Sequence, residues 1–152
     1  MEVSVDNHGM PSEVDAILSD LLAVTGASRV TLRQSLQGEY AFPVTHEALA
    51  PGVGSLRDER TVDLRTQPVA LEVAAGRQVV QDDCAAAYDD PAFHRMREVY
   101  GGLAAQIVTP VVGAGATVVG IVSVHQLGTP RHWSEDEIEA CRAAAERLRE
   151  LL

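Results

Sequence analysis

The sequence predicts an α+β domain with an antiparallel sheet, and three observations support this prediction. Two runs rich in β-branched residues, 107–112 and 118–125, flank a glycine-containing turn at 113–116, which is the pattern of a β-hairpin. The segment that begins at Ser134 has the composition of a long closing helix. Residues 14–22 carry apolar side chains at helical spacing, which indicates a helix near the start of the chain.

The N-terminal part is expected to contain a tail, a helix and a strand. Residues 1–11 show no regular period, and we expect a flexible tail there, before a single domain at 12–152. Ser12 suits the N-cap of the first helix, and Gly26 suits its end. The alternating segment 29–34 then predicts a strand.

A partner for this strand is predicted at 40–45, after a turn at Gly38. Pro43 indicates an edge strand or the end of one, because proline cannot donate a ladder hydrogen bond. Segment 46–67 shows no clear period and is either a long loop or weak structure.

Shorter elements are expected in the middle of the chain. Segment 68–75 predicts a helix opened by proline, and 78–81 predicts a short strand. Segment 82–90 is acidic and irregular, and a second proline opens a further helix over 91–100.

The closing helix has the clearest local signals. Ser134 and Glu137 have the spacing of a capping box at its start. Cys141 falls on the same apolar stripe as Ile138 and Leu148, so we expect its thiol to be a small buried group of the core.

Composition restricts the classes of partner. The chain has 152 residues and a net charge of −10, which disfavours nucleic acid and anionic membranes because like charges repel. It shows no signal sequence and no apolar run that could span a bilayer, so a cytoplasmic location is expected. Its two cysteines, neither in a C-x-x-C pair, predict neither a disulfide scaffold nor a structural metal site.

Three local sequences, in their order and spacing, resemble the GAF domain family. Residues 74–82 are similar to the helix–Gly–strand–Asp step before the ligand loop of the family. Residues 107–111 look like its apolar strand ending in Pro-Val, and 120–125 followed by 131–137 look like its last strand and closing helix. The resemblance covers the chain from residue 12 to 152.

The resemblance implies a GAF/PAS-like fold and a small-molecule ligand. In that fold a central antiparallel sheet carries the N- and C-terminal helices on one face, and ligand-covering loops and short helices on the other. The family also implies a homodimer formed through the terminal helices.

The ligand-covering part of the family corresponds to residues 82–100, whose acidic character disfavours strongly anionic ligands, although Arg95 and Arg97 could offset this locally. The alternative is that its polar groups face water. The residues predicted to contact the ligand are Asp83, Cys84, His94, Arg97 and Tyr100.

Tetrapyrroles are the first cofactors to consider. Phytochrome-type GAF domains attach a bilin through a Cys-His pair, and the corresponding positions here are Phe93 and His94. Phenylalanine has no nucleophile, so covalent attachment at Phe93 is excluded. His94 or His125 could be an axial ligand of haem, although a lone histidine is more often a structural residue. The cofactor therefore stays unknown.

The resulting hypothesis is a sensory or regulatory GAF domain that binds a small molecule and signals through a partner protein, without an output domain of its own. The alternative is a small enzyme that uses the same pocket, with Cys84 or His94 as the reactive group. A thiol reductase would need a second thiol near Cys84, and Cys141 is expected in the core. A third interpretation is a dimerisation module with a filled pocket.

Overall fold

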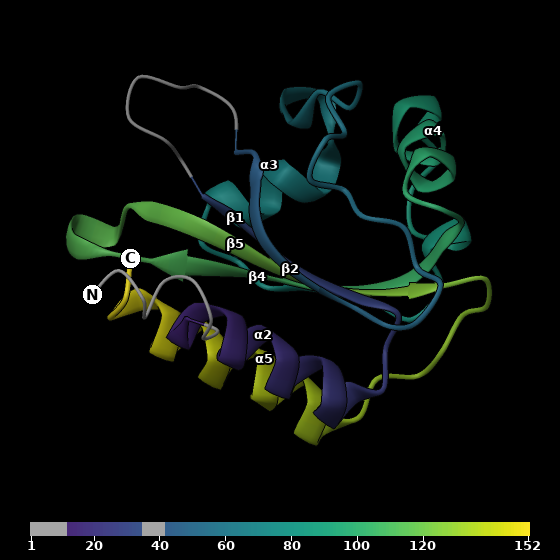
Figure 1. Cartoon of the computed structure of the whole chain (residues 1–152). Coiled ribbons are helices and arrows are strands. Elements are labelled where there is room, and N and C mark those ends of the chain that lie inside the picture. Colours follow the sequence, from purple (N-terminus) through teal and green to yellow (C-terminus); the bar gives the residue numbers. More distant parts are fainter. Residues whose placement is uncertain (1–11, 35–41) are drawn as a thin grey trace.

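The structure is a computed structural model that describes residues 12–34 and 42–152. Five strands form one antiparallel sheet in the order β2-β1-β5-β4-β3 (Figure 1). This confirms the α+β class and the antiparallel sheet. The strands are β1 (Arg29–Gln34), β2 (Val44–Leu49), β3 (Val79–Gln81), β4 (Leu103–Val112) and β5 (Val118–Leu127).

The predicted hairpin is formed by β4 and β5. Ile107 pairs with Val124 in its register, and the Gly113 N–H donates to the Thr117 carbonyl at 2.7 Å where the chain reverses. Gly115 has a φ of 68°, a left-handed conformation that glycine adopts without steric strain.

Two long helices, α2 (Glu13–Thr25) and α5 (Glu135–Arg149), cover one face of the sheet (Figure 1). Their apolar stripes are buried against alternate strand residues, and burying one such aliphatic side chain contributes about 1.5–3 kcal/mol. Cys141 is among the fully buried groups, as predicted. Other members of this core with no exposed surface include Leu18, Val30, Ile107, Val124 and Leu148.

Both helices begin at the predicted residues. The Asp15 N–H donates to Ser12 Oγ at 3.1 Å, and Ser134 and Glu137 form both hydrogen bonds of a capping box. Gly26 ends α2 with a φ of 62°. In the described part of the chain, no helix combines the length and apolar character that crossing a membrane requires.

The opposite face carries shorter elements over a second core (Figure 1). Val73, Phe93 and Leu103 are fully buried there. This arrangement confirms the layers implied by the GAF resemblance. The elements are the 3-10 turns η1 (Leu64–Thr66) and η2 (Cys84–Ala86) and the helices α3 (Pro68–Ala74) and α4 (Pro91–Val99).

The position of the second strand was predicted wrongly. The observed strand β2 covers 44–49 and lies at the edge of the sheet; the predicted range 40–45 overlaps it at 44–45, residues 42–43 precede it, and residues 40–41 lie outside the described residues. Pro43 precedes it and accepts a hydrogen bond from the Gln34 N–H at 3.2 Å through its carbonyl. Residues 45–47 are polar, as edge strands allow, so the hydrophobic pattern did not reveal a strand. The expected turn at Gly38 and the expected tail at 1–11 lie outside the described residues.

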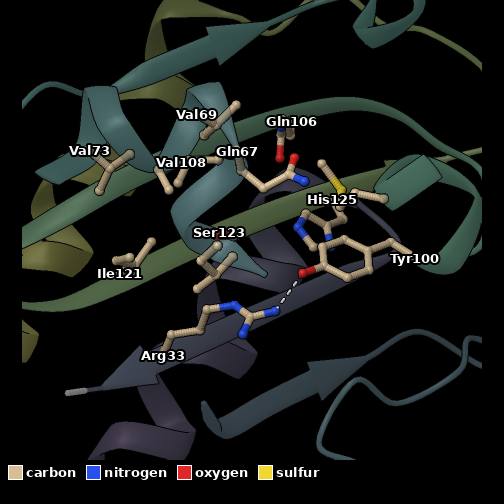
Figure 2. Close-up of a pocket in the computed structure, with 13 residues that line it drawn as sticks. Arg33, Gln67, Val69, Val73, Tyr100, Gln106, Val108, Ile121, Ser123 and His125 are labelled. Carbon is tan, nitrogen blue, oxygen red and sulfur yellow. Dashed lines mark hydrogen bonds between the residues drawn. The ribbon is translucent and has the colours of Figure 1, made fainter. Parts of the chain in front are cut away.

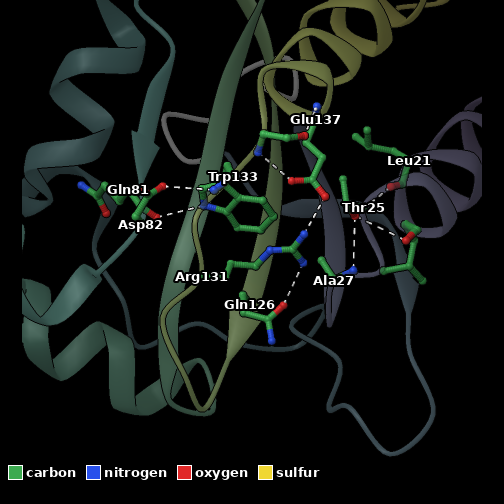
Figure 3. Close-up of polar contacts among 11 residues, drawn as sticks. Leu21, Thr25, Ala27, Gln81, Asp82, Gln126, Arg131, Trp133 and Glu137 are labelled. Atoms are coloured by element: carbon green, nitrogen blue, oxygen red, sulfur yellow. Dashed lines mark hydrogen bonds and ion pairs between the residues drawn. The ribbon is translucent and has the colours of Figure 1, made fainter.

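The segment before α5 is held against β3 by Trp133 (Figure 3). Its indole Nε1–H donates to the Gln81 carbonyl at 3.0 Å, and the Arg131 guanidinium lies 4.2 Å from the ring centroid. Arg131 also donates to Glu137 of α5 at 2.6 Å and to Gln126 of β5 at 3.2 Å. These contacts fix the start of α5 relative to the sheet.

Candidate ligand-binding site

Strand alternation brings polar side chains to the face of the sheet opposite α2 and α5. In β5, Val122 and Val124 belong to the core under those helices, so Ser123 and His125 point to the other face. Arg29 of β1 is the register partner of His125, and residues paired directly across a ladder share a face.

A cavity of about 50 Å³ lies between this face and the covering elements (Figure 2). One water molecule needs roughly 10–15 Å³, so the cavity has room for a few waters or a small organic molecule. Its apolar walls include Val69, Val73, Val108 and Ile121. Its polar lining consists of Arg33, Gln67, Tyr100, Gln106, Ser123 and His125.

Arg29 is buried next to the cavity, with 1% of its surface exposed. Its Nη2 donates to the Tyr100 carbonyl at 2.7 Å, its Nη1 to the Gly54 carbonyl at 3.0 Å and its Nε to His125 Nδ1 at 3.1 Å. Burial lowers the pKa of the guanidinium to about 10, while the charge of Glu47 acts in the opposite direction. Arg29 is therefore a buried cation at neutral pH.

His125 is held in one protonation state by this contact. Because Arg29 Nε can only donate, His125 Nδ1 must accept, and the ring proton of the neutral imidazole lies on Nε2. Burial lowers the pKa of His125 well below 6.5, and the charges of Arg29 and Arg33 lower it further. Nε2–H has no hydrogen-bond acceptor among the described residues.

Tyr100 contributes a second donor at the cavity. Its ring is stacked on that of His125, with centroids 5.8 Å apart, and its hydroxyl accepts from Arg33 Nη2 at 2.8 Å (Figure 2). Burial raises the pKa of Tyr100, so the hydroxyl keeps its proton at neutral pH. Among the described residues, nothing accepts that proton.

Gln67 supplies an acceptor without a partner. Its Nε2 donates to the Ala92 carbonyl at 3.2 Å, which fixes the orientation of the amide. Its Oε1 is buried and has no hydrogen-bond donor in the described residues. Gln106 differs, because its Nε2 donates to Gln81 Oε1 at 2.9 Å.

Tyr100 is the member of the predicted ligand-binding set that lines the cavity. His94 and Arg97 instead hold α4 in place: Arg97 Nη1 lies 3.1 Å from His94 Nδ1, and Arg97 Nε donates to the Leu103 carbonyl at 2.8 Å. His94 Nε2 lies 2.8 Å from the Tyr88 carbonyl.

Asp83 and Cys84 lie at η2, away from the cavity lining. Asp83 Oδ1 accepts from the Ala85 N–H at 3.1 Å, and the buried Cys84 thiol donates to Gln81 Oε1 at 3.4 Å. Burial raises the pKa of Cys84 to about 12, so the thiol is protonated and a weak nucleophile at neutral pH. Ligand contact by these two residues and by His94 and Arg97 stays a prediction.

Several cavity residues were not predicted as ligand contacts. Gln106, Ser123 and His125 interrupt otherwise apolar strands, and a polar residue in a strand buried on both faces needs a partner. That signal could have identified them. Gln67 lies in the segment whose structure the sequence did not predict, and Arg33 resembles any charged residue near a strand end.

The surroundings of the two histidines that were considered as haem ligands do not suit haem. Both ring nitrogens of His94 lie at hydrogen-bonding distance from protein atoms, and His125 reaches only the cavity of about 50 Å³, which is too small for a porphyrin. Across 12–34 and 42–152, no group of three or more His, Cys, Asp or Glu side chains could hold a metal ion.

The arrangement of an antiparallel sheet, two long helices on one face and a covered cavity on the other defines an α+β fold of the GAF/PAS type. A comparison with models of protein families matches residues 11–150 to the GAF domain. The protein belongs to the GAF domain family. A comparison with curated proteins found no match.

Solved structures with this fold are similar at low sequence identity. The blue-light absorbing form of the Thermosynechococcus elongatus PixJ GAF domain has a TM-score of 0.71 and 22% identity, over 99% of this chain and 90% of that chain. GAF3 from Slr1393 of Synechocystis sp. PCC6803, in its photoproduct state, has a TM-score of 0.71 and 19% identity, over 89% and 87%. The chromophore-binding domain of the bacteriophytochrome RpBphP3 from R. palustris has a TM-score of 0.74 and 19% identity, over 91% and 52%. At these identities the likeness shows the fold alone.

Proposed function

We propose that this protein is a sensory or regulatory GAF domain that binds a small molecule in the cavity. The supporting observation is that His125 Nε2–H, the Tyr100 hydroxyl proton and Gln67 Oε1 lack partners among the described residues. Of these groups, Gln67 Oε1 is buried, and an unpaired buried polar group costs about 1–3 kcal/mol. A ligand that pairs Gln67 Oε1 recovers that free energy.

A tetrapyrrole does not fit these residues, although the structural neighbours are described as light-absorbing or chromophore-binding domains. Phe93, which stands at the position of the attachment thiol, is fully buried, and Tyr88 packs edge-on against it with centroids 4.8 Å apart. The cavity of about 50 Å³ is also well below the roughly 300–1,000 Å³ of drug-sized sites. The ligand we propose is therefore smaller.

Arg29 offers a route from the cavity to the surface. His125 faces the cavity with Nε2, and its Nδ1 accepts from Arg29, which also holds the carbonyls of Gly54 and Tyr100. A ligand that displaces His125 alters these bonds and so shifts the populations of the loops they hold. In this proposal a cytoplasmic partner protein reads that shift, and the terminal helices form a homodimer.

The test is ligand-dependent thermal stabilisation together with native mass spectrometry of the freshly purified protein. A panel of small metabolites should include compounds that raise the melting temperature in a saturable way, without turnover of the compound. Ala70→Leu, which places a larger side chain in the cavity wall, should remove the shift, whereas Ala143→Leu, at an exposed position of α5 outside this cavity, should not. A panel without any shift, and a native mass equal to that of the bare chain, would argue for a filled, non-binding module. The same spectrum reports whether the protein is a dimer.

A further inference from the structure

The charges around the cavity indicate what kind of molecule it takes. We propose that the cavity binds a small carboxylate of about four to six non-hydrogen atoms that also carries a hydrogen-bond donor, such as a short 2-hydroxy acid. This inference rests on the proposed ligand-binding function and names the chemical class of the ligand.

Three donors converge at one end of the cavity. The Tyr100 hydroxyl and His125 Nε2–H come from stacked rings, and Arg33 donates to the same hydroxyl (Figure 2). Toward the described residues, the Arg33 guanidinium uses two of its five N–H groups, one on the Phe42 carbonyl and one on Tyr100, which leaves others to pair with a ligand. A carboxylate has two oxygens and accepts several hydrogen bonds, which suits this set of donors.

Among the residues that the structure describes, no acidic side chain lines the cavity to compete for these donors. Glu47 is the carboxylate whose charge raises the pKa of Arg29. It accepts a hydrogen bond from the Leu56 N–H at 3.1 Å and forms an ion pair with Arg57 at 3.6 Å. The charge of Glu59 acts on Arg33 and Tyr100, but Glu59 does not line the cavity, and its carboxylate accepts from the Thr61 N–H at 2.7 Å. The buried cation Arg29 and the partly buried Arg33 therefore favour an anion in the cavity.

The rest of the cavity restricts the remainder of the ligand. Gln67 Oε1 has no donor and is buried, so a hydroxyl or ammonium group on the ligand would pair it. The walls formed by Val73, Val108 and Ile121 suit a short aliphatic group and disfavour inorganic phosphate, which has polar oxygens on every side. The volume of about 50 Å³ sets the size limit.

From the sequence, we expect strongly anionic ligands to be disfavoured, because the covering segment 82–100 is acidic. Asp83 and Asp89, however, are exposed to solvent and do not line the cavity. Solvent and salt screen exposed charges strongly, whereas a charge in a buried site is screened much less. The cations at the cavity therefore outweigh the acidic surface in our proposal.

The experiment compares three probes of similar size by titration calorimetry at constant ionic strength: lactate, its neutral amide lactamide, and propanoate, which lacks the hydroxyl. Lactate should bind at least tenfold more tightly than lactamide, because hydrogen bonds to a charged group are the stronger ones. Propanoate should bind more weakly than lactate, because it leaves Gln67 Oε1 unpaired.

Two variants locate the anion site. Arg33→Gln should weaken lactate binding at least tenfold and leave lactamide binding nearly unchanged, while the exposed Arg77→Gln should change neither. His125→Asn removes the donor at Nε2 but keeps an acceptor for Arg29, and it should also weaken lactate binding. Circular dichroism establishes whether each variant folds, and the comparison of probes on the unaltered protein needs no variant.

The possible outcomes separate this inference from the proposed function. Equal binding of lactate and lactamide, lost together in Ala70→Leu, would overturn the carboxylate inference and leave a ligand-binding domain. Absence of binding by all three probes also overturns it, and the metabolite panel then decides the proposed function. Lactate binding that Arg33→Gln and His125→Asn do not change would place the anion elsewhere on the molecule, which contradicts the inference as well.

Discussion

Arg29 Nε donates a hydrogen bond to His125 Nδ1 at 3.1 Å, between two residues that pair directly across β1 and β5. A buried guanidinium usually has a carboxylate partner, yet the hydrogen-bond acceptors of Arg29 here are two carbonyls and a neutral imidazole. This contact sets the tautomer of His125 and thereby presents an N–H group to the cavity. It also connects the sheet with the loop at Gly54 and the end of α4 at Tyr100.

Replacing Arg29 with methionine should destabilise the protein. Arg29→Met removes three hydrogen bonds and leaves the carbonyls of Gly54 and Tyr100 without this donor, so we expect a loss of about 2–4 kcal/mol in the free energy of unfolding. Urea unfolding followed by circular dichroism measures this change. The control is Arg142→Met, whose exposed ion pair with Glu139 should contribute less than about 1 kcal/mol.

An unchanged or higher stability in Arg29→Met would contradict this expectation. It would show that removing the desolvation cost of the buried charge outweighs the three hydrogen bonds, as is known for some buried ion pairs.

His125 should make stability depend on pH on the acidic side of neutrality. It is neutral in the folded protein, because burial lowers its pKa well below 6.5 and the charges of Arg29 and Arg33 lower that pKa further. Tyr100, whose ring is stacked on His125, is also uncharged. Below pH 6.5 the unfolded chain binds a proton that the folded protein does not bind. As the pH is lowered from 6.5 toward the pKa of His125 in the folded protein, the free energy of unfolding should therefore decrease by up to about 1.4 kcal/mol per pH unit.

The variant His125→Asn isolates this contribution, since asparagine does not titrate. Urea midpoints measured at several pH values between roughly 5.5 and 7.5, one unit either side of the histidine pKa of about 6.5, should show a shallower slope for the variant than for the unaltered protein. Identical slopes would mean that His125 binds a proton as readily in the folded protein as in the unfolded chain, which conflicts with its role as an acceptor for Arg29.

The elements that the sequence predicted well depend on local signals. A capping box at Ser134, a glycine at the end of α2 and a run of β-branched residues each act within a few residues of the chain. The predicted position of the edge strand β2 was shifted toward the N-terminus, because its partly exposed polar residues show no clear hydrophobic alternation. Its position is set by pairing with β1.

The cavity could not be predicted in the same way, because its contacts are distant in sequence. Arg33 and Tyr100 are 67 residues apart, and Arg29 and His125 are 96 residues apart. The resemblance to the GAF family pointed to segment 82–100, and Tyr100 of that segment lines the cavity. The polar residues on the sheet side required the strand register, which alternation alone does not fix.

The two thiols should be protected from modification in the folded protein. Cys84 and Cys141 are fully buried, and burial raises the pKa of each to about 12. Ellman's reagent should therefore react with neither thiol faster than the protein opens, and with both after addition of guanidinium. Fast reaction of one thiol in native buffer, absent in Cys84→Ala but present in Cys141→Ala, would support the alternative of a thiol-dependent enzyme.

Trp133 should stabilise the junction between β3 and α5 without affecting the cavity. Trp133→Phe keeps an aromatic ring under Arg131 but removes the donor to the Gln81 carbonyl, so we expect a loss of about 1–3 kcal/mol in the free energy of unfolding. The chain has one tryptophan, so circular dichroism must follow the unfolding of both proteins. Ligand-induced shifts in melting temperature should be equal in Trp133→Phe and the unaltered protein, because Trp133 does not line the cavity. A variant with undiminished stability would show that the hydrogen bond to Gln81 contributes nothing net, and that packing alone holds α5 at this end of the sheet.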